Sequence, residues 1–546
     1  MKSKILIRFL LSLGAVISLG MPSSVVHAQE EELPQENSWY LVTPSIVWCD
    51  ATTNKTDLFK VEIHIVNLAN VTGVSLEADK DYQLFDDGTH GDLAAGDNVW
   101  TLSDISMFCW IGPDGISTPS FQLHVTLNES RKLTNMYLVS FGAVSSYFKG
   151  NFPSVDLGNG LSATKYAFFI LDSQHEVMDS YPVANVFCGT TNYMAFRKLY
   201  SVFPDMFDTA IVTPAMTLFH PLTFGENVPY EVPVKNEVQH IGMPLVDKTS
   251  EFGSAGRLKS VIYHSFGDVA IIDHEIAHTW GATIGLGLGL LQQRDFEHWD
   301  ELTDIGGQLG AYYFSDDGQY IGHFKDNGDG TWRLVANSEV EKYSPLELYI
   351  MGFISPDQVP PIHILSNIDL ADLEHIKASV QSTVTIDQII AAEGGARIPS
   401  IAESQKDFTA AYIVTSDQPY NDAAYAFFSI LSYRLMSRKP PMENSSFAPF
   451  YWATNGLGTL DTTLPVDLPE AALIPGDPTA TPLPTHTPTP APTPTYYGVK
   501  PTVEDTAEIT GESEPGKGFL GNCGLIPAAV ILLPAVYLTL RKRIFH

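Results

Sequence analysis

The chain is short of positive charge. Among its 546 residues, 31 Lys and Arg stand against 63 Asp and Glu, which gives a formal net charge of −32. A surface of this sign repels phosphate backbones, so nucleic acid is not an expected partner. Charged residues make up only 17% of the chain and hydrophobic residues 44%. This balance argues against global disorder and predicts sizeable cores, which the length divides into two to four domains.

Cysteine is also scarce. The four cysteines include no CxxC pair, which argues against a zinc site built from cysteine thiolates. Cys49 and Cys109 fall in one region of strand-like pattern, and an exported protein keeps its disulfides. We therefore expect these two cysteines to pair.

The two ends of the chain predict a signal peptide and a membrane anchor. Residues 1–28 have a basic start, an apolar run and a small residue at the expected cleavage point, as signal peptides do. Residues 524–540 are apolar and uncharged for 17 residues, and three basic residues follow at once. They predict a single transmembrane helix with a cytoplasmic C-terminus, with a processed sorting tag or a buried core helix as alternatives. The predicted location is the outer cell surface, anchored in the membrane.

The segments between these ends differ in pattern. Residues 38–144 alternate apolar and polar positions, clearly so in 60–66 and 120–126, and predict an all-β, Ig-like sandwich. Residues 145–466 mix strand and helix patterns, with helical spacing over 417–438, and predict an α+β catalytic domain. Residues 467–518 are first rich in Thr and Pro and then acidic, which predicts an extended linker.

Two Asp- and Gly-rich stretches allow two interpretations each. Residues 84–101 contain Asp86, Asp87, Asp92 and Asp97, which suit either a long turn with capped amides or a structural calcium loop. The turn is favoured, because the ligand order of an EF-hand is absent. Residues 326–331 (DNGDGT) likewise predict a hairpin turn, with a calcium loop as the alternative.

The chemical centre of the sequence is the HExxH pattern at residues 274–278. On a helix, His274 and His278 lie one turn apart and project from one face, so both imidazoles can reach one Zn²⁺. Glu275 can then take a proton from a zinc-activated water. A helix whose His and Glu make ordinary hydrogen bonds is the alternative.

The third ligand is not given by the motif. Ile284 stands where the metzincin pattern HExxHxxGxxH has its last histidine, so this is not a regular metzincin. In gluzincins a glutamate on a second helix lies about twenty residues after the second histidine. Glu297 lies 19 and His298 lies 20 residues after His278. His298 completes a His₃ set with water in the fourth position, and Glu297 is the competing choice, with Glu301 as its supporting carboxylate.

A family resemblance favours His298. The HEIAHTW motif, the later His298-Trp299 pair and residues 343–352 (YSPLELYIMG) together resemble a family of secreted bacterial zincin-like metalloproteases. The resemblance runs from about residue 192 to 353, and Ala277 replaces the family's usual glycine. It implies a zincin-like fold, a zinc ion and peptidase activity. Within YSPLELYIMG, Tyr349 is a candidate donor to the oxyanion, and Met351 a candidate floor under the metal, although both also suit a plain core.

These observations predict an extracellular, membrane-anchored zinc metallopeptidase. Zn²⁺ is held by His274, His278 and His298, and Glu275 is the general base. Two other functions fit the same sequence: a surface adhesin on a non-catalytic zincin scaffold, and a zinc hydrolase acting on a non-peptide cell-wall or glycan substrate. The intact Glu275 argues against the adhesin, because a scaffold needs no general base.

Overall fold

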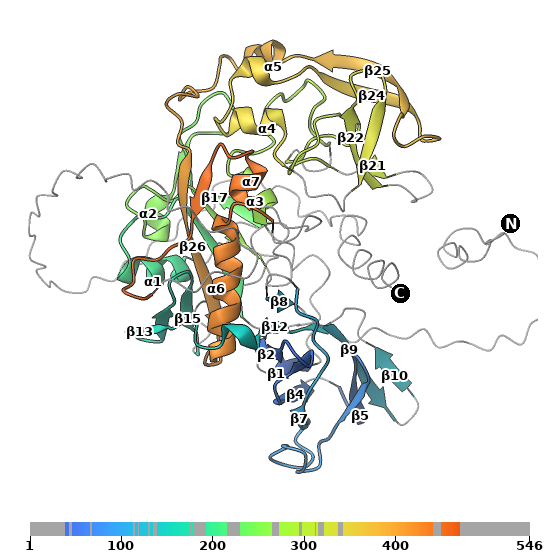
Figure 1. Cartoon of the computed structure of the whole chain (residues 1–546), viewed down its shortest axis with the longest axis vertical. Helices are drawn as coiled ribbons and strands as arrows, with labels where there is room; N and C mark the ends of the chain where they lie inside the picture. Colours follow the sequence, from blue (N-terminus) through green and yellow to red (C-terminus); the bar gives the residue numbers. More distant parts are fainter. Residues whose placement is uncertain are drawn as a thin grey trace, which may run out of the picture.

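The computed structural model (Figure 1) describes residues 39–42, 46–65, 68–112, 115–117, 120–128, 131–134, 139–173, 177, 193–215, 230–264, 272–293, 297–311, 313–314, 321–336, 342–440 and 449–469. The predicted signal peptide (1–28), residues 470–518 of the predicted linker and the predicted anchor (524–540) lie outside the described residues.

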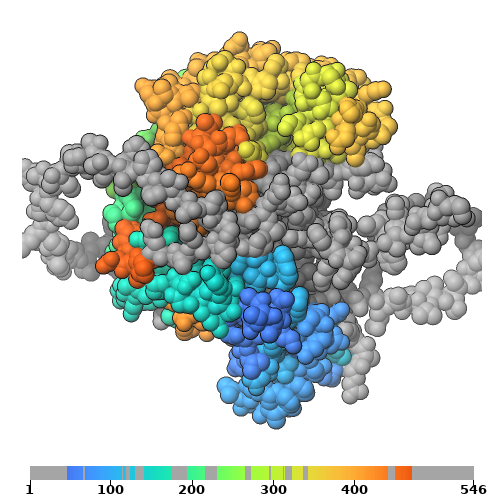
Figure 2. Space-filling view, viewed as in Figure 1, coloured from blue at the N-terminus to red at the C-terminus, as the bar shows by residue number. Residues whose placement is uncertain are grey.

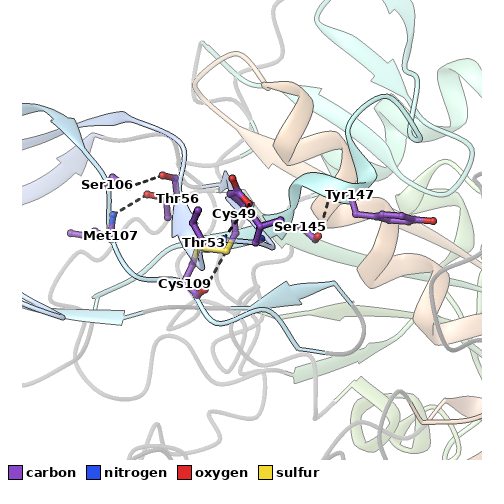
Figure 3. Close-up of a disulfide and its surroundings, with 10 residues drawn as sticks. Cys49, Thr53, Thr56, Ser106, Met107, Cys109, Ser145 and Tyr147 are labelled. Carbon is purple, nitrogen blue, oxygen red and sulfur yellow. Dashed lines mark hydrogen bonds between the residues drawn. A yellow bond between two sulfur atoms is a disulfide. The ribbon is translucent and has the colours of Figure 1, made fainter.

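The N-terminal part is a set of small sheets around a core of its own. In β4 (Phe59–Ile65) every second residue is buried, so Val61 and Ile63 point inward while Glu62 points outward. Cys49 and Cys109 form the predicted disulfide inside this core, where Thr56 bonds both Ser106 and Met107 (Figure 3). The other strands are β1 (Trp39–Val42), β2 (Ile46–Asp50), β3 (Lys55–Thr56), β5 (Val71–Glu77), β6 (Asp81–Leu84), β7 (Val99–Ile105), β8 (Ile116–Ser117), β9 (Ser120–Leu127), β10 (Arg131–Thr134), β11 (Val139–Ser140) and β12 (Gly142–Ser145).

An eight-stranded sheet follows and forms the middle of the molecule. Its order is β13-β14-β15-β26-β16-β20-β17, with β27 beside β26. Strands β15, β26, β16 and β20 run parallel, and β17 closes one edge antiparallel to β20. The bounds are β13 (Val155–Gly158), β14 (Leu161–Ala163), β15 (Phe168–Leu171), β16 (Thr209–Pro214), β17 (Tyr230–Pro233), β20 (Ser260–Tyr263), β26 (Asp407–Ser416) and β27 (Thr459–Asp461).

Two apolar cores cover the two faces of this sheet. One contains Ile262 of β20 and Tyr412 of β26, together with side chains of the long helix α6 (Asp422–Met436) and of α3 (Ile272–His278). The other contains Ile413 and Val261 with α1 (Met194–Val202) and α2 (Thr249–Phe252). Alternate residues of one strand therefore serve opposite layers, as the two-residue period of a strand requires. Helix α6 also meets the N-terminal part, where Asn421 donates to the carbonyl of Ile46.

Hairpins and short helices form a further layer at the far end from the N-terminal sheets (Figures 1 and 2). Its members include β21 to β23, which form a meander, and the hairpin β24–β25. The remaining elements are β18 (Lys235–Asn236), β19 (Val246–Asp247), β21 (Tyr313–Phe314), β22 (Ile321–Asp326), β23 (Trp332–Ala336), β24 (Ile362–Asp369), β25 (Lys377–Val384), α4 (Pro345–Ile350), α5 (Ile386–Ala392), α7 (Phe450–Ala453), and the 3₁₀ helices η1 (Ser146–Phe148) and η4 (Pro356–Gln358).

The predicted fold class is wrong. It was an α+β zincin-like catalytic domain after an all-β sandwich, with a single C-terminal transmembrane helix. The described residues are rich in β-structure and contain few helices, of which α6 is the longest with 15 residues. None of the described helices combines the length and the apolar character needed to cross a bilayer. One physical reason is the glycine-rich stretch after α3, where Gly281, Gly285, Gly287 and Gly289 all take positive φ and so prevent further helix.

Several local predictions are confirmed. Residues 60–66 and 120–126 correspond to β4 and β9, and 417–438 contains α6. The DNGDGT stretch is the turn of the β22–β23 hairpin. These segments have a clear hydrophobic period or a recognised turn composition, which act locally.

Candidate metal centre

Helix α3 carries the first two candidate ligands. Ile272 and Ile276 are buried in the same core as Ile262 of the sheet, so the helix lies with its apolar side on the sheet. His274 and His278 are four residues apart and occupy one face. Their Nε2 atoms are 3.2 Å apart, and both side chains remain partly accessible.

The chain then turns back to bring up a third imidazole. Helix α3 ends at His278. The turn after it closes at Gly281, whose amide donates to the carbonyl of Ala277 and whose φ is +67°. The backbone of His298 and Trp299 lies between two neighbours: Gln292 donates to the carbonyl of His298, and Trp299 donates to the carbonyl of Leu309. This places His298 Nε2 3.1 Å from His274 Nε2. The described residues 297–304 form no helix, so the second helix that a gluzincin would have here is absent from them. Isolated bridges instead join Trp299, the residue after His298, to Leu291 and Gly310.

The three histidines fit a metal ion. Their ligand atoms all lie within 4.8 Å of one another. Two nitrogens bound to one Zn²⁺ at tetrahedral angles, with bonds of about 2.0–2.1 Å, lie roughly 3.3–3.4 Å apart. The two closest Nε2 separations, 3.1 and 3.2 Å, are near this value. The Nε2 atoms of both His278 and His298 approach His274 Nε2. A hydrogen bond can account for only one of these approaches, because His274 Nε2 has a single lone pair.

The protonation states suit the same interpretation. His274 Nδ1 lies 2.5 Å from the carbonyl oxygen of Gln308. A carbonyl only accepts, so Nδ1 carries the proton and Nε2 keeps its lone pair. Burial lowers the pKa of His278 well below its ordinary value, and positive charge on His274 or His298 would lower it further. Neutral imidazoles are the form that binds a metal.

Glu275 has a buried carboxyl and directly follows the first candidate ligand, His274, in α3. It is 3% exposed, and burial together with the charge of Glu297 raises its pKa to about 8, against a lowering hydrogen bond from the backbone of Glu231. Burial and the charges of Glu275 and Glu297 also raise the pKa of Glu231, on the edge strand β17. The carboxyl groups of Glu231, Glu275 and Glu297 thus repel one another, and a like charge near a buried carboxyl favours its protonation or a bound cation.

Glu297 and Glu301 do not join the imidazoles as ligands in the described geometry. Glu297 is exposed, and the close group consists of His274, His278 and His298. Glu301 accepts a hydrogen bond from the side chain of Gln292, at 3.0 Å. The choice between His298 and Glu297 as a zinc ligand stays a prediction, which the closeness of the three imidazoles favours.

The two residues singled out in the YSPLELYIMG segment belong to the core. Tyr349 is 2% exposed, and its hydroxyl accepts a hydrogen bond from the backbone amide of Arg397 at 3.2 Å. Met351 is 1% exposed in the same apolar core. The described contacts therefore give Tyr349 a structural role, and its oxyanion role stays a prediction without a contact that supports it.

The aspartate loops mainly cap backbone amides. Asp86 accepts from the amides of Gly96, Asp97 and Asn98, and Asp92 from that of Gly88. This is the favoured turn arrangement. Asp86, Asp92 and Asp97 lie close enough to share an ion, as do Asp304, Asp326 and His363. Calcium binding stays a prediction for the first group.

Known proteins add nothing to this picture. No protein-family model, curated protein or solved structure matches the chain. The resemblance to secreted zincin-like metalloproteases therefore stays a prediction that depends on its motifs alone.

Sequence reasoning missed the backbone groups at the site. The carbonyl of Gln308 accepts from His274, and the backbone of Glu231 bonds Glu275. Any residue type supplies these groups, so no local signal in the sequence marks them. A third residue, Glu347, was missed although it lies within YSPLELYIMG.

Proposed function

We propose that this chain is an exported zinc-dependent hydrolase that cleaves peptide bonds. One observation carries the proposal: three imidazole nitrogens converge, and Glu275, which follows His274 directly in α3, has a buried carboxyl. A scaffold without turnover has no need of a buried carboxyl next to a metal site, because burying it costs free energy. The Cys49–Cys109 disulfide supports export, since disulfides persist mainly in oxidising compartments.

The residues divide the work as follows. His274, His278 and His298 would hold Zn²⁺, which supplies Lewis acidity and lowers the pKa of a coordinated water. Gln308 fixes the ring of His274 by accepting its Nδ1 proton. Glu275 takes a proton from the attacking water and later donates it to the leaving amine. The backbone of Glu231 supplies a hydrogen-bond donor to the Glu275 carboxyl.

Replacement of Glu275 tests the reaction. Glu275→Gln keeps the shape of the side chain but removes its basicity, so kcat/KM on a mixed peptide substrate is expected to fall at least ~100-fold. Zinc content per chain, measured by elemental analysis, is expected to stay at one. An unchanged rate would refute the catalytic assignment and favour a binding protein. Release of products from cell-wall fragments but not from peptides would favour a non-peptide substrate.

Replacement of the candidate ligands tests the metal set. His298→Ala is expected to lose stoichiometric zinc, because it leaves two imidazoles, whereas Glu297→Ala is expected to keep it. Zinc content of the purified variants after dialysis measures both. The opposite pattern would make Glu297 the third ligand.

A further inference from the structure

We propose that Glu347 is a positioning residue for the metal centre. Its buried carboxylate holds both ends of the loop 298–309, which carries His298 at one end and the carbonyl that orients His274 at the other. The proposal rests on the proposed zinc centre and adds a residue that the motif does not contain.

The carboxylate of Glu347 accepts four hydrogen bonds. Oε1 accepts from the indole Nε1 of Trp299 at 3.1 Å and from the amide of Leu309 at 2.7 Å. Oε2 accepts from the amide of Gln308 at 3.2 Å and from the amide of Ser344 at 2.6 Å. Glu347 is 0% exposed. A buried carboxylate with both oxygens doubly satisfied is a fixed point, because moving it would leave several buried polar groups unpaired.

The origin of this arrangement is local. Ser344 and Glu347 form the capping box of α4, in which the serine side chain accepts from the Glu347 amide and the glutamate side chain accepts from the Ser344 amide. A capping-box glutamate ordinarily needs only that one partner. Here Oε1 takes both of its donors from the loop 298–309.

Gly307 allows the loop to come this close. A Cβ atom built on Gly307 would lie 2.2 Å from Glu347 Oε2, and the residue has a φ of +84°. Both its space and its backbone conformation therefore require glycine. The backbone of the loop at Gly307 therefore lies directly against the carboxylate of Glu347.

Two contacts of Glu347, with Trp299 and with Gln308, lie next to groups that position the imidazoles. Trp299 follows His298 directly, and its 0% exposed indole ring fixes where that backbone runs. Gln308 donates its amide to Glu347 while its carbonyl accepts from His274 Nδ1. The same carboxylate thus acts through two different neighbours on two of the three imidazoles, whose Nε2 atoms are 3.1 Å apart.

Glu347→Gln tests the proposal, because it keeps the size of the side chain but turns one acceptor oxygen into a donor. That amide group would face two N–H donors, so one end of the loop should shift. Substitutions around metal ligands typically weaken metal binding about 10–100-fold. We expect a loss in this range for Zn²⁺, measured by chelator competition, and an altered visible absorption spectrum of the Co²⁺-substituted protein.

Asp208→Asn is the matched control. Asp208 is also buried, at 2% exposed, and its Oδ2 accepts from Thr409 and Arg257 beside the eight-stranded sheet. Its loss should lower stability without touching the loop 298–309. Even if Asp208→Asn loses as much stability as Glu347→Gln, we therefore expect it to keep the zinc affinity and the Co²⁺ spectrum of the wild type.

The outcomes separate the proposal from its basis. A Glu347→Gln protein with wild-type zinc affinity and Co²⁺ spectrum overturns the positioning role, even if wild type binds zinc and hydrolyses peptides. Equal weakening in Asp208→Asn also overturns it, since the effect would then follow stability alone. If Glu347→Gln does not fold, Trp299→Phe removes one donor only. Weaker zinc binding by Trp299→Phe then supports the positioning role, and wild-type zinc binding by this variant overturns it. A wild type that binds no zinc refutes the proposed function itself.

Discussion

At the scale of single residues, one buried histidine predicts that stability depends on pH. His323 on β22 is 5% exposed, and burial lowers its pKa from the ordinary value to about 4, against a raising hydrogen bond from the backbone of Ala311. A Cβ atom on Gly310 would lie 2.8 Å from the ring of His323. His323 thus packs against Gly310, directly after the loop 298–309, and its buried ring leaves a charge little solvation.

The depressed pKa predicts a loss of stability in acid. The folded state binds the His323 proton less readily than the unfolded chain, so this group's contribution is intact above pH ~6.5. It is lost as the pH falls toward about 4, at about 1.4 kcal/mol per pH unit and about 3 kcal/mol in all. Urea unfolding of wild type and of His323→Gln at pH 7 and pH 5 measures it.

The comparison is made between the two proteins, because other groups also titrate in this range. The stability of wild type should fall more steeply between pH 7 and pH 5 than that of the variant. Parallel curves would mean that His323 is protonated in the fold or is readily hydrated.

At the scale of elements, the end of α3 decides where the chain goes after its two histidines. Gly281 has a φ of +67°, and a Cβ there would lie 3.1 Å from Met243 Sδ and 3.3 Å from Thr283 Oγ1. Gly281→Ala is expected to cost about 1–2 kcal/mol for the left-handed conformation alone, and more for the contacts. Denaturant unfolding measures the loss.

Gly287 provides the control for that substitution. It has a φ of +88° but no atom within 4 Å of an added Cβ. Gly287→Ala should therefore show the backbone cost without the contact cost, and be the milder variant. If both variants are as stable as the wild type, the turn after α3 accommodates a Cβ without a loss in the free energy of unfolding.

At the scale of the whole molecule, the disulfide and helix α3 belong to different apolar cores. The Cys49–Cys109 disulfide lies in the N-terminal core, whereas Ile272 and Ile276 of α3 pack in another. The bond joins residues 60 apart in sequence. Chain-entropy estimates give about 4 kcal/mol for a loop of this length.

Removal of the disulfide should therefore act on the N-terminal part first. The double variant Cys49→Ala, Cys109→Ala is expected to unfold at lower denaturant concentration, as followed by circular dichroism, while zinc content per chain stays unchanged. Loss of zinc in the folded variant would show that the two parts are strongly coupled. The hydrogen bond from Asn421, the N-cap of α6, to the carbonyl of Ile46 is one contact between them.

Sequence and tertiary structure contributed different parts of this picture. The sequence by itself determined what short-range periods encode: the pairing of His274 with His278, strands β4 and β9, helix α6 and the DNGDGT turn. The tertiary structure alone decided how His298 returns to His274, which carbonyl orients that ring, and why Glu347 is buried. It also corrected the fold class. The physical reason is range: backbone preferences act within a few residues, whereas loop return and carboxylate burial depend on partners that the chain meets only when folded.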